Sequence, residues 1–173
     1  FNHGIRAESK EEVEFVVEMA EQRDLSCEVI ELSLPQGSHL QERAREERRK
    51  TLLKFNAAKI ATGHHQDDQA ETVLFRLLRG TGLSGAKAML PCQGLFVRPL
   101  LFVPKAEIIA YATENALHWH EDPSNRKSTR GKIRELFPLL NEIRHNPSVS
   151  LARSARLFAR DEAFLQLLTE EKF

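Results

Sequence analysis

The sequence has 173 residues, of which 41% are hydrophobic and 29% charged, and this composition is that of one ordinary globular domain. It excludes disordered and collagen-like chains, and no run reaches the ~18 consecutive apolar residues of a membrane-spanning helix, so we expect a cytoplasmic protein with no membrane partner. Lysine plus arginine equals aspartate plus glutamate at 25 each, so net charge gives no indication of a nucleic-acid partner.

Apolar residues recur at intervals of three and four in some segments and at alternate positions in others, which predicts helices and strands respectively. In chain order the expected elements are a helix from Ser9, a strand at 28–34, a helix at 40–55, a strand at 58–61, a helix at 67–78, a glycine loop at 80–85, a strand at 95–99, a helix after Pro104, a helix near Ile133 and a helix at 149–168. Strands that alternate with helices favour an α/β fold, with a parallel sheet and flanking helices. We expect this core over residues 1–125 and a helical extension over residues 126–173.

Positive charge is concentrated in two stretches, which can be either phosphate-contacting surfaces or solvated helix faces. The first stretch also carries glutamates at helix-pair spacing, which favours a solvated face for part of it. The two sets are Arg43, Arg45, Arg48, Arg49 and Lys50, and Arg126, Lys127, Arg130, Lys132 and Arg134. The two cysteines, Cys27 and Cys92, form no C-x-x-C pattern, so we expect two reduced thiols.

The densest run of chemically capable residues is GHHQDDQAETVLFRLLRGTG, at residues 63–82. It is placed at the end of a strand, through a turn and along a helix, which is where ligands bind in open α/β sheets. Asp68 and Glu71 share one face of the first helical turn, where two carboxylates can hold Mg²⁺ or the ammonium of a cationic substrate. The same spacing is also typical of a helix-capping pair, so both interpretations stay open.

The histidine pair that precedes the double aspartate raises a second class of function. His64, His65 and Asp68 are the residue types of a metal-dependent phosphohydrolase. That site needs further ligands, and the remaining histidines form no recognisable partner motif. We therefore expect no metal site built from these residues.

The run at 63–82 is similar, nearly position by position, to the signature of the tRNA(Ile)-lysidine synthetases of the N-type ATP pyrophosphatase superfamily. Further segments resemble the same family in the same order: NHGIRAES at 2–9, LQERAREERR at 40–49, RPLL at 98–101 and WHEDPSN at 119–125. The resemblance implies an adenine nucleotide alpha-hydrolase-like fold. It also implies an enzyme that uses ATP and Mg²⁺ to adenylate C2 of the wobble cytidine of isoleucine tRNA and then joins free lysine there.

The resemblance also implies roles for individual residues. Asp68 and Glu71 match the positions that hold lysine, and His64 lies at the active-site turn. The resemblance gives Arg45 or Arg48 the role of stabilising phosphate charge. His3 and Gly4 match the loop beside the nucleotide, and Arg130 and Arg134 resemble late basic residues near the site.

The family also has a phosphate-binding SGGxDS motif, expected upstream of His3, which residues 1–173 do not contain. We therefore expect an N-terminally truncated chain that folds as an incomplete domain and does not turn over ATP alone. An unpaired sheet edge would lower its stability or join two copies in a homodimer. Two alternatives remain: a tRNA thiolating enzyme of the same superfamily, although such enzymes commonly carry paired cysteines, and an inactive RNA-binding fragment.

Overall fold

The computed structural model describes residues 1, 9–32, 40–119 and 129–170. The chain divides into two compact units, Phe1–Ala58 and Lys59–Phe173. The domain boundary expected at residues 125 and 126 falls outside the described residues and stays a prediction. In the described part, no helix is long and apolar enough to cross a membrane.

The first unit contains two helices, α1 (Ser9–Glu21) and α2 (Leu40–Leu52), both of which the sequence predicts. Acidic residues in the first turn of α1 and basic residues in the last turn of α2 favour these ends through the helix dipole. Lys50 pairs with Glu46 at 3.2 Å and with Glu47 at 3.0 Å, and these hydrogen-bonded glutamates raise the pKa of its ammonium. Of the strand expected at 28–34, the described residues 28–32 show a single bridge position, at Glu31.

The second unit contains a three-stranded sheet in the order β1-β3-β2. β1 (Ile60–Ala61) runs parallel to β3 (Phe96–Val97), as the sequence predicts, whereas β2 (Cys92–Gln93) pairs with β3 in the antiparallel sense. The turn between β2 and β3 contains Gly94, whose φ of 60° is readily adopted by glycine. The strand β2 was not predicted, because two residues show no alternation.

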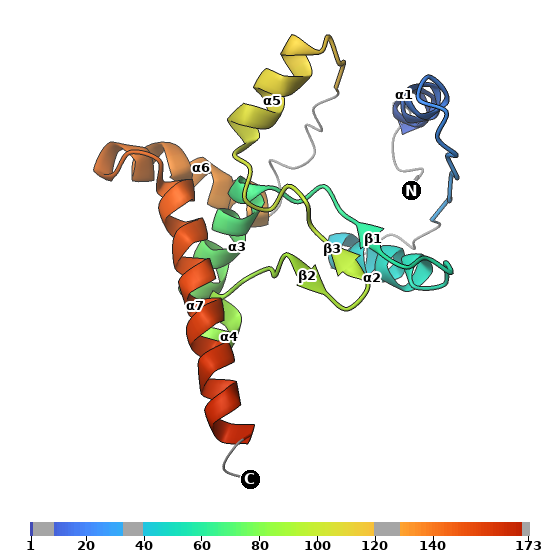
Figure 1. Cartoon of the computed structure of the whole chain (residues 1–173). Helices are drawn as coiled ribbons and strands as arrows, with labels where there is room; N and C mark the ends of the chain where they lie inside the picture. Colours follow the sequence, from blue (N-terminus) through green and yellow to red (C-terminus); the bar gives the residue numbers. More distant parts are fainter. Residues whose placement is uncertain (2–8, 33–39, 120–128, 171–173) are drawn as a thin grey trace. The chain divides into compact units, whose positions relative to one another are not determined.

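The described part of the second unit also contains helices, and Figure 1 shows α3 and α4 lying along α7. The helices are α3 (Gln66–Leu78), α4 (Leu83–Ala86), α5 (Lys105–Glu114), α6 (Thr129–Ile143) and α7 (Pro147–Glu170). All except α4 are predicted, and α4 lies within the expected glycine loop. Val73 of α3 is fully buried against Ala155 of α7, and such small residues let two helices approach closely.

Polar side chains of α3 fix the loop that follows α4. The amide of Gln69 donates to the carbonyls of Met89 at 2.8 Å and Lys87 at 3.3 Å, and its oxygen accepts the N–H of Met89 at 2.9 Å. Arg76 donates to the carbonyl of Gly85 at 2.7 Å. Lys87 in turn pairs with Glu162 of α7, and this hydrogen bond lowers the pKa of the Glu162 carboxyl. These hydrogen bonds and this ion pair therefore tie α3 to the segment around α4, and that segment to α7.

Candidate active site

The turn between β1 and α3 carries the first residues of the site. The hydroxyl of Thr62 and Nδ1 of His64 are hydrogen-bonded at 2.9 Å. The backbone N–H of His65 donates to Oδ2 of Asp68 at 3.0 Å, so Asp68 completes a capping box whose N-cap is His65, and not the Asp68–Glu71 capping pair that the sequence suggested. Capping occupies one oxygen of Asp68, and within the described residues its other oxygen, Oδ1, makes no hydrogen bond.

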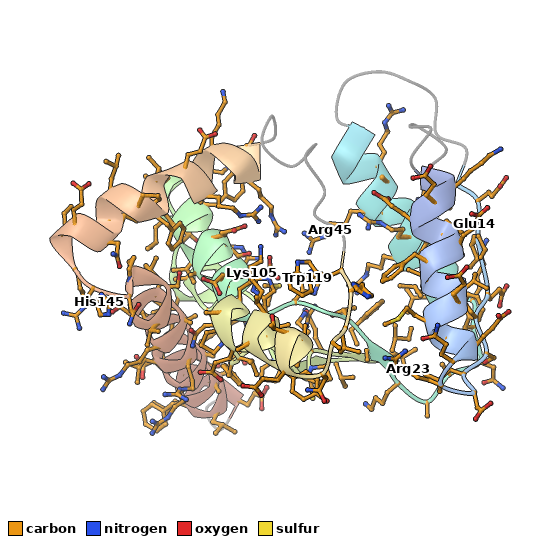
Figure 2. All side chains as sticks on the ribbon, turned by 90° about the horizontal axis from the view of Figure 1, so that it is seen from above. Glu14, Arg23, Arg45, Lys105, Trp119 and His145 are labelled. Carbon is orange, nitrogen blue, oxygen red and sulfur yellow. The ribbon has the colours of Figure 1, made fainter. Side chains whose placement is uncertain are left out.

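Asp67 joins the start of α3 to the start of α5. Its Oδ2 accepts the backbone N–H of Lys105 at 2.8 Å, and this bond satisfies one of the free N–H groups at the first turn of α5. Val103 accepts the backbone N–H of Gln66 at 3.0 Å, so two hydrogen bonds fix the segment before α5 on α3. The side chain of Lys105, labelled in Figure 2, lines the same cavity as Asp67.

Glu71 forms the strongest ion pair of the site. Its side chain is 4% exposed, and both of its oxygens bind Arg134 of α6, Oε1 to Nε at 2.6 Å and Oε2 to Nη2 at 3.1 Å. The hydrogen bond to Glu71 raises the pKa of the Arg134 guanidinium, and the charges of Asp68 and Asp67 act in the same direction. A bidentate pair of this kind fixes the orientation of the guanidinium as well as neutralising its charge.

A cavity of about 350 Å³ joins these groups, a size typical of small-molecule sites. It is lined by His65, Asp67, Asp68, Glu71, Lys105, Arg134, Phe137 and Ser148. With histidine neutral, its three carboxylates exceed its two cations by one negative charge. Because Glu71 and Arg134 satisfy each other, the excess negative charge lies at Asp67 and Asp68.

Comparison with known proteins identifies the family of the chain. Residues 1–140 match the family model described as a PP-loop domain. The chain belongs to the PP-loop domain family. Its predicted α/β fold is confirmed by this match and by a solved relative, the U34-tRNA thiolase NcsA from Methanococcus maripaludis with its [4Fe-4S] cluster, which is 18% identical and has a TM-score of 0.70. That alignment covers 91% of this chain and 59% of NcsA.

Curated relatives of this PP-loop chain carry the name tRNA(Ile)-lysidine synthase, which confirms the resemblance seen in the sequence. The protein from Thermosipho africanus is 44% identical and covers 82% of this chain, that from Bacillus thuringiensis subsp. konkukian is 37% identical over 95%, and that from Pseudomonas fluorescens is 36% identical over 98%. The chain spans 36%, 38% and 40% of the lengths of these three relatives respectively.

The structure of this PP-loop chain brings together some predicted site residues and not others. Asp68, Glu71 and Arg134 line one cavity, whereas His64 is not among the lining residues and bonds to Thr62. The residues of α2 lie in the first unit, where Arg48 donates to the carbonyl of Ala44 at 3.3 Å, so the proposed phosphate role of Arg45 or Arg48 stays a prediction. The roles expected of His3 and Gly4 fall outside the described residues.

Four cavity residues had no role in the sequence prediction: Asp67, Lys105, Phe137 and Ser148. Asp67 stands beside Asp68 and Lys105 follows the helix-start Pro104, so each had a weak signal. Phe137 and Ser148 had none, because they come to the cavity through the packing of α6 and α7. Among the described residues, no group of three or more His, Cys, Asp or Glu could hold a metal ion.

Proposed function

We propose that the chain forms the catalytic core of a tRNA(Ile)-lysidine synthetase, which uses ATP to join lysine to C2 of the wobble cytidine of isoleucine tRNA through an adenylated intermediate. The observation that carries the proposal is the acidic cavity at the start of α3, within the segment that resembles the family signature. The names of the curated relatives support the same reaction. A tRNA substrate also agrees with the cytoplasmic location expected from the sequence.

Asp68 is the residue best placed to receive the side-chain ammonium of lysine. Its side chain is 18% exposed, and within the described residues Oδ1 makes no hydrogen bond. Asp67, whose side chain is 35% exposed, adds a second negative charge at the same end of the cavity. A partly buried carboxylate holds an ammonium more strongly than an exposed one, because water screens the pair less.

Glu71 acts in this proposal through Arg134 and not by direct contact with the lysine side chain. Both Glu71 oxygens are used by the guanidinium, whose side chain remains 52% exposed. The exposed part of Arg134 can bind an anion, such as the carboxylate of an amino acid. The cavity therefore has a negative end and a positive group, which match the two ends of lysine.

The remaining steps concern the proton and the phosphates. The ε-amine must lose a proton before it attacks C2, and His65, which lines the cavity, is a histidine, the residue type most often used as a general base.

ATP supplies the adenylate group that activates the cytidine, and Mg²⁺ neutralises the phosphates of ATP. Within the described residues, Oδ1 of Asp67 makes no hydrogen bond, and a carboxylate oxygen of this kind is a ligand that fits Mg²⁺. Association of two chains, expected from the sequence, stays a prediction.

Titration with lysine and with norleucine tests the proposal. Norleucine has the same backbone carboxylate and the same four-carbon side chain as lysine but lacks the terminal ammonium, so it loses the contact with Asp68. We expect calorimetry on the natural chain that carries residues 1–173 to give a Kd for norleucine at least tenfold higher, because a charge-assisted contact contributes ~1.5–3 kcal/mol. Equal affinity for the two amino acids would contradict an ammonium site at Asp68.

A further inference from the structure

One face of α7 carries a row of exposed arginines that neither the fold nor the cavity uses. Arg153, Arg156 and Arg160 lie within an arc of about 60° around the helix axis, given 100° per residue. An adjacent face is buried in the core through Ala152 and Ala155. We call these three residues the arginine stripe. Helix α7 is the red helix of Figure 1, which packs against α3 and α4, and all three residues of the stripe are exposed.

The charges of the arginine stripe are not matched by carboxylates. Within the described residues, none of the three arginines has a hydrogen bond or an ion pair. The stretch 147–160 contains no aspartate or glutamate. The basic end of α2 differs, because Lys50 there is paired with two glutamates of its own helix. The stripe therefore presents to a partner three positive charges that have no ion-pair partner in the part of the chain that the structure describes.

The stripe begins close to the proposed active site. Ser148, in the first turn of α7, lines the cavity. At 1.5 Å per residue, Arg153 lies about 7.5 Å further along the helix axis and Arg160 about 18 Å. A nucleic-acid chain with one nucleotide at the cavity would reach this distance with its next two or three phosphates, which are spaced by roughly 6 Å in a single strand.

We infer that the arginine stripe binds the phosphate backbone of the tRNA beside the nucleotide that reacts in the cavity. This inference rests on the proposed function. Guanidinium groups bind phosphate oxygens through two parallel hydrogen bonds, and such contacts position RNA without reading its sequence. Phe164 is 61% exposed on the same face, one turn beyond Arg160, where it can stack on an unpaired base.

A membrane surface fits the stripe less well than RNA does. Helices that lie on membranes insert a free apolar face below a basic one. In α7 the face beside the stripe is covered, since Ala152 and Ala155 are 3% and 1% exposed. The exposed apolar residues near the stripe, Val149, Leu157 and Phe164, alternate with the arginines along the helix and do not lie below them.

A triple substitution, R153Q/R156Q/R160Q, tests the inference in the natural chain that carries residues 1–173. We expect the Kd for isoleucine tRNA to rise by about tenfold or more near 100 mM salt, and the slope of log Kd against log salt to fall by about two to three. The affinity for lysine should not change, because no stripe residue lines the cavity. Glutamine is a good helix former and the positions are exposed, so the thermal unfolding midpoint should differ from that of the wild type by no more than about 2 °C.

Two matched variants separate position from charge. R153K/R156K/R160K keeps the positive charges and should retain most of the affinity at low salt. K10Q/R23Q/K54Q removes three exposed charges from the first unit and should leave the Kd for tRNA nearly unchanged. If this control weakens binding as much as the stripe variant, the effect is one of net charge and the inference is overturned.

The remaining outcomes distinguish the stripe from the proposed function. Unchanged tRNA affinity in R153Q/R156Q/R160Q, with tight binding by the wild type, overturns the stripe and leaves the proposed function intact. Absence of tRNA binding by the wild type overturns both. If R153Q/R156Q/R160Q loses binding to phosphatidylglycerol vesicles but keeps its affinity for tRNA, the stripe binds a membrane surface, and the RNA assignment is overturned.

Discussion

Replacing Arg134 with methionine is expected to lower the free energy of unfolding by about 2–3 kcal/mol, because the buried carboxylate of Glu71 loses its cation. The effect lies toward the low end for buried ion pairs, since the Arg134 side chain is 52% exposed and water screens it. Urea denaturation of the natural chain that carries residues 1–173 measures the loss. Lys132→Met, at an exposed position on the same helix, is the matched control and should change stability little.

A second variant shows whether the loss comes from the unpaired charge or from lost packing. In E71L/R134M both charges are replaced by apolar groups, so no buried carboxylate remains without a partner. We expect this double variant to recover more than half of the stability lost by R134M. A double variant no more stable than R134M alone would show that the pair contributes through shape and not through charge.

Replacing Asp68 with asparagine is expected to raise the KM for lysine by about tenfold or more, while adenylation of the tRNA changes little. Asparagine keeps an oxygen that can accept the N–H of His65, so the start of α3 stays capped. Adenylation is followed as tRNA-dependent release of pyrophosphate, and lysine transfer as labelled lysine retained on the tRNA. Glu135→Gln, at an exposed position on α6, is the control for loss of one charge.

The opposite pattern would assign Asp68 a different role. If adenylation collapses in D68N while the KM for lysine stays at the wild-type value, the carboxylate holds Mg²⁺ and not lysine. Loss of both steps with reduced stability would be a folding effect, and thermal unfolding of the same sample identifies it. The thermal stability of D68N should therefore be measured together with its two activities.

The sequence predicted the position of α3 closely, because acidic residues mark its start and apolar residues recur along it at helical spacing. The capping role of Asp68 was predicted with the wrong partner, Glu71, because histidine is not a preferred N-cap, whereas Asp68 in fact accepts the N–H of His65. The prediction failed for α4, whose four residues stand among glycines that are typical of a loop. It also failed for β2, because a two-residue strand has no periodicity to detect.

The partner of Glu71 could not be found from local pattern. Glu71 and Arg134 are 63 positions apart, and their contact depends on how α6 packs on α3. The sequence suggested that Glu71 offers its charge to a ligand, and the structure shows both of its oxygens bound to Arg134. Phe137 and Ser148 reach the cavity in the same way, through the packing of helices and not through a motif.

The identity of the nucleoside that the enzyme makes tests the central claim most directly. Isoleucine tRNA is incubated with ATP, ¹³C-labelled lysine and the natural chain that carries residues 1–173, and the tRNA is digested to nucleosides for mass spectrometry. We predict a cytidine whose mass has increased by labelled lysine less one water, because the amine replaces the C2 oxygen, which leaves with AMP. A sulfur-containing nucleoside would place the chain with the thiolating enzymes, and an unmodified cytidine would contradict the proposed reaction.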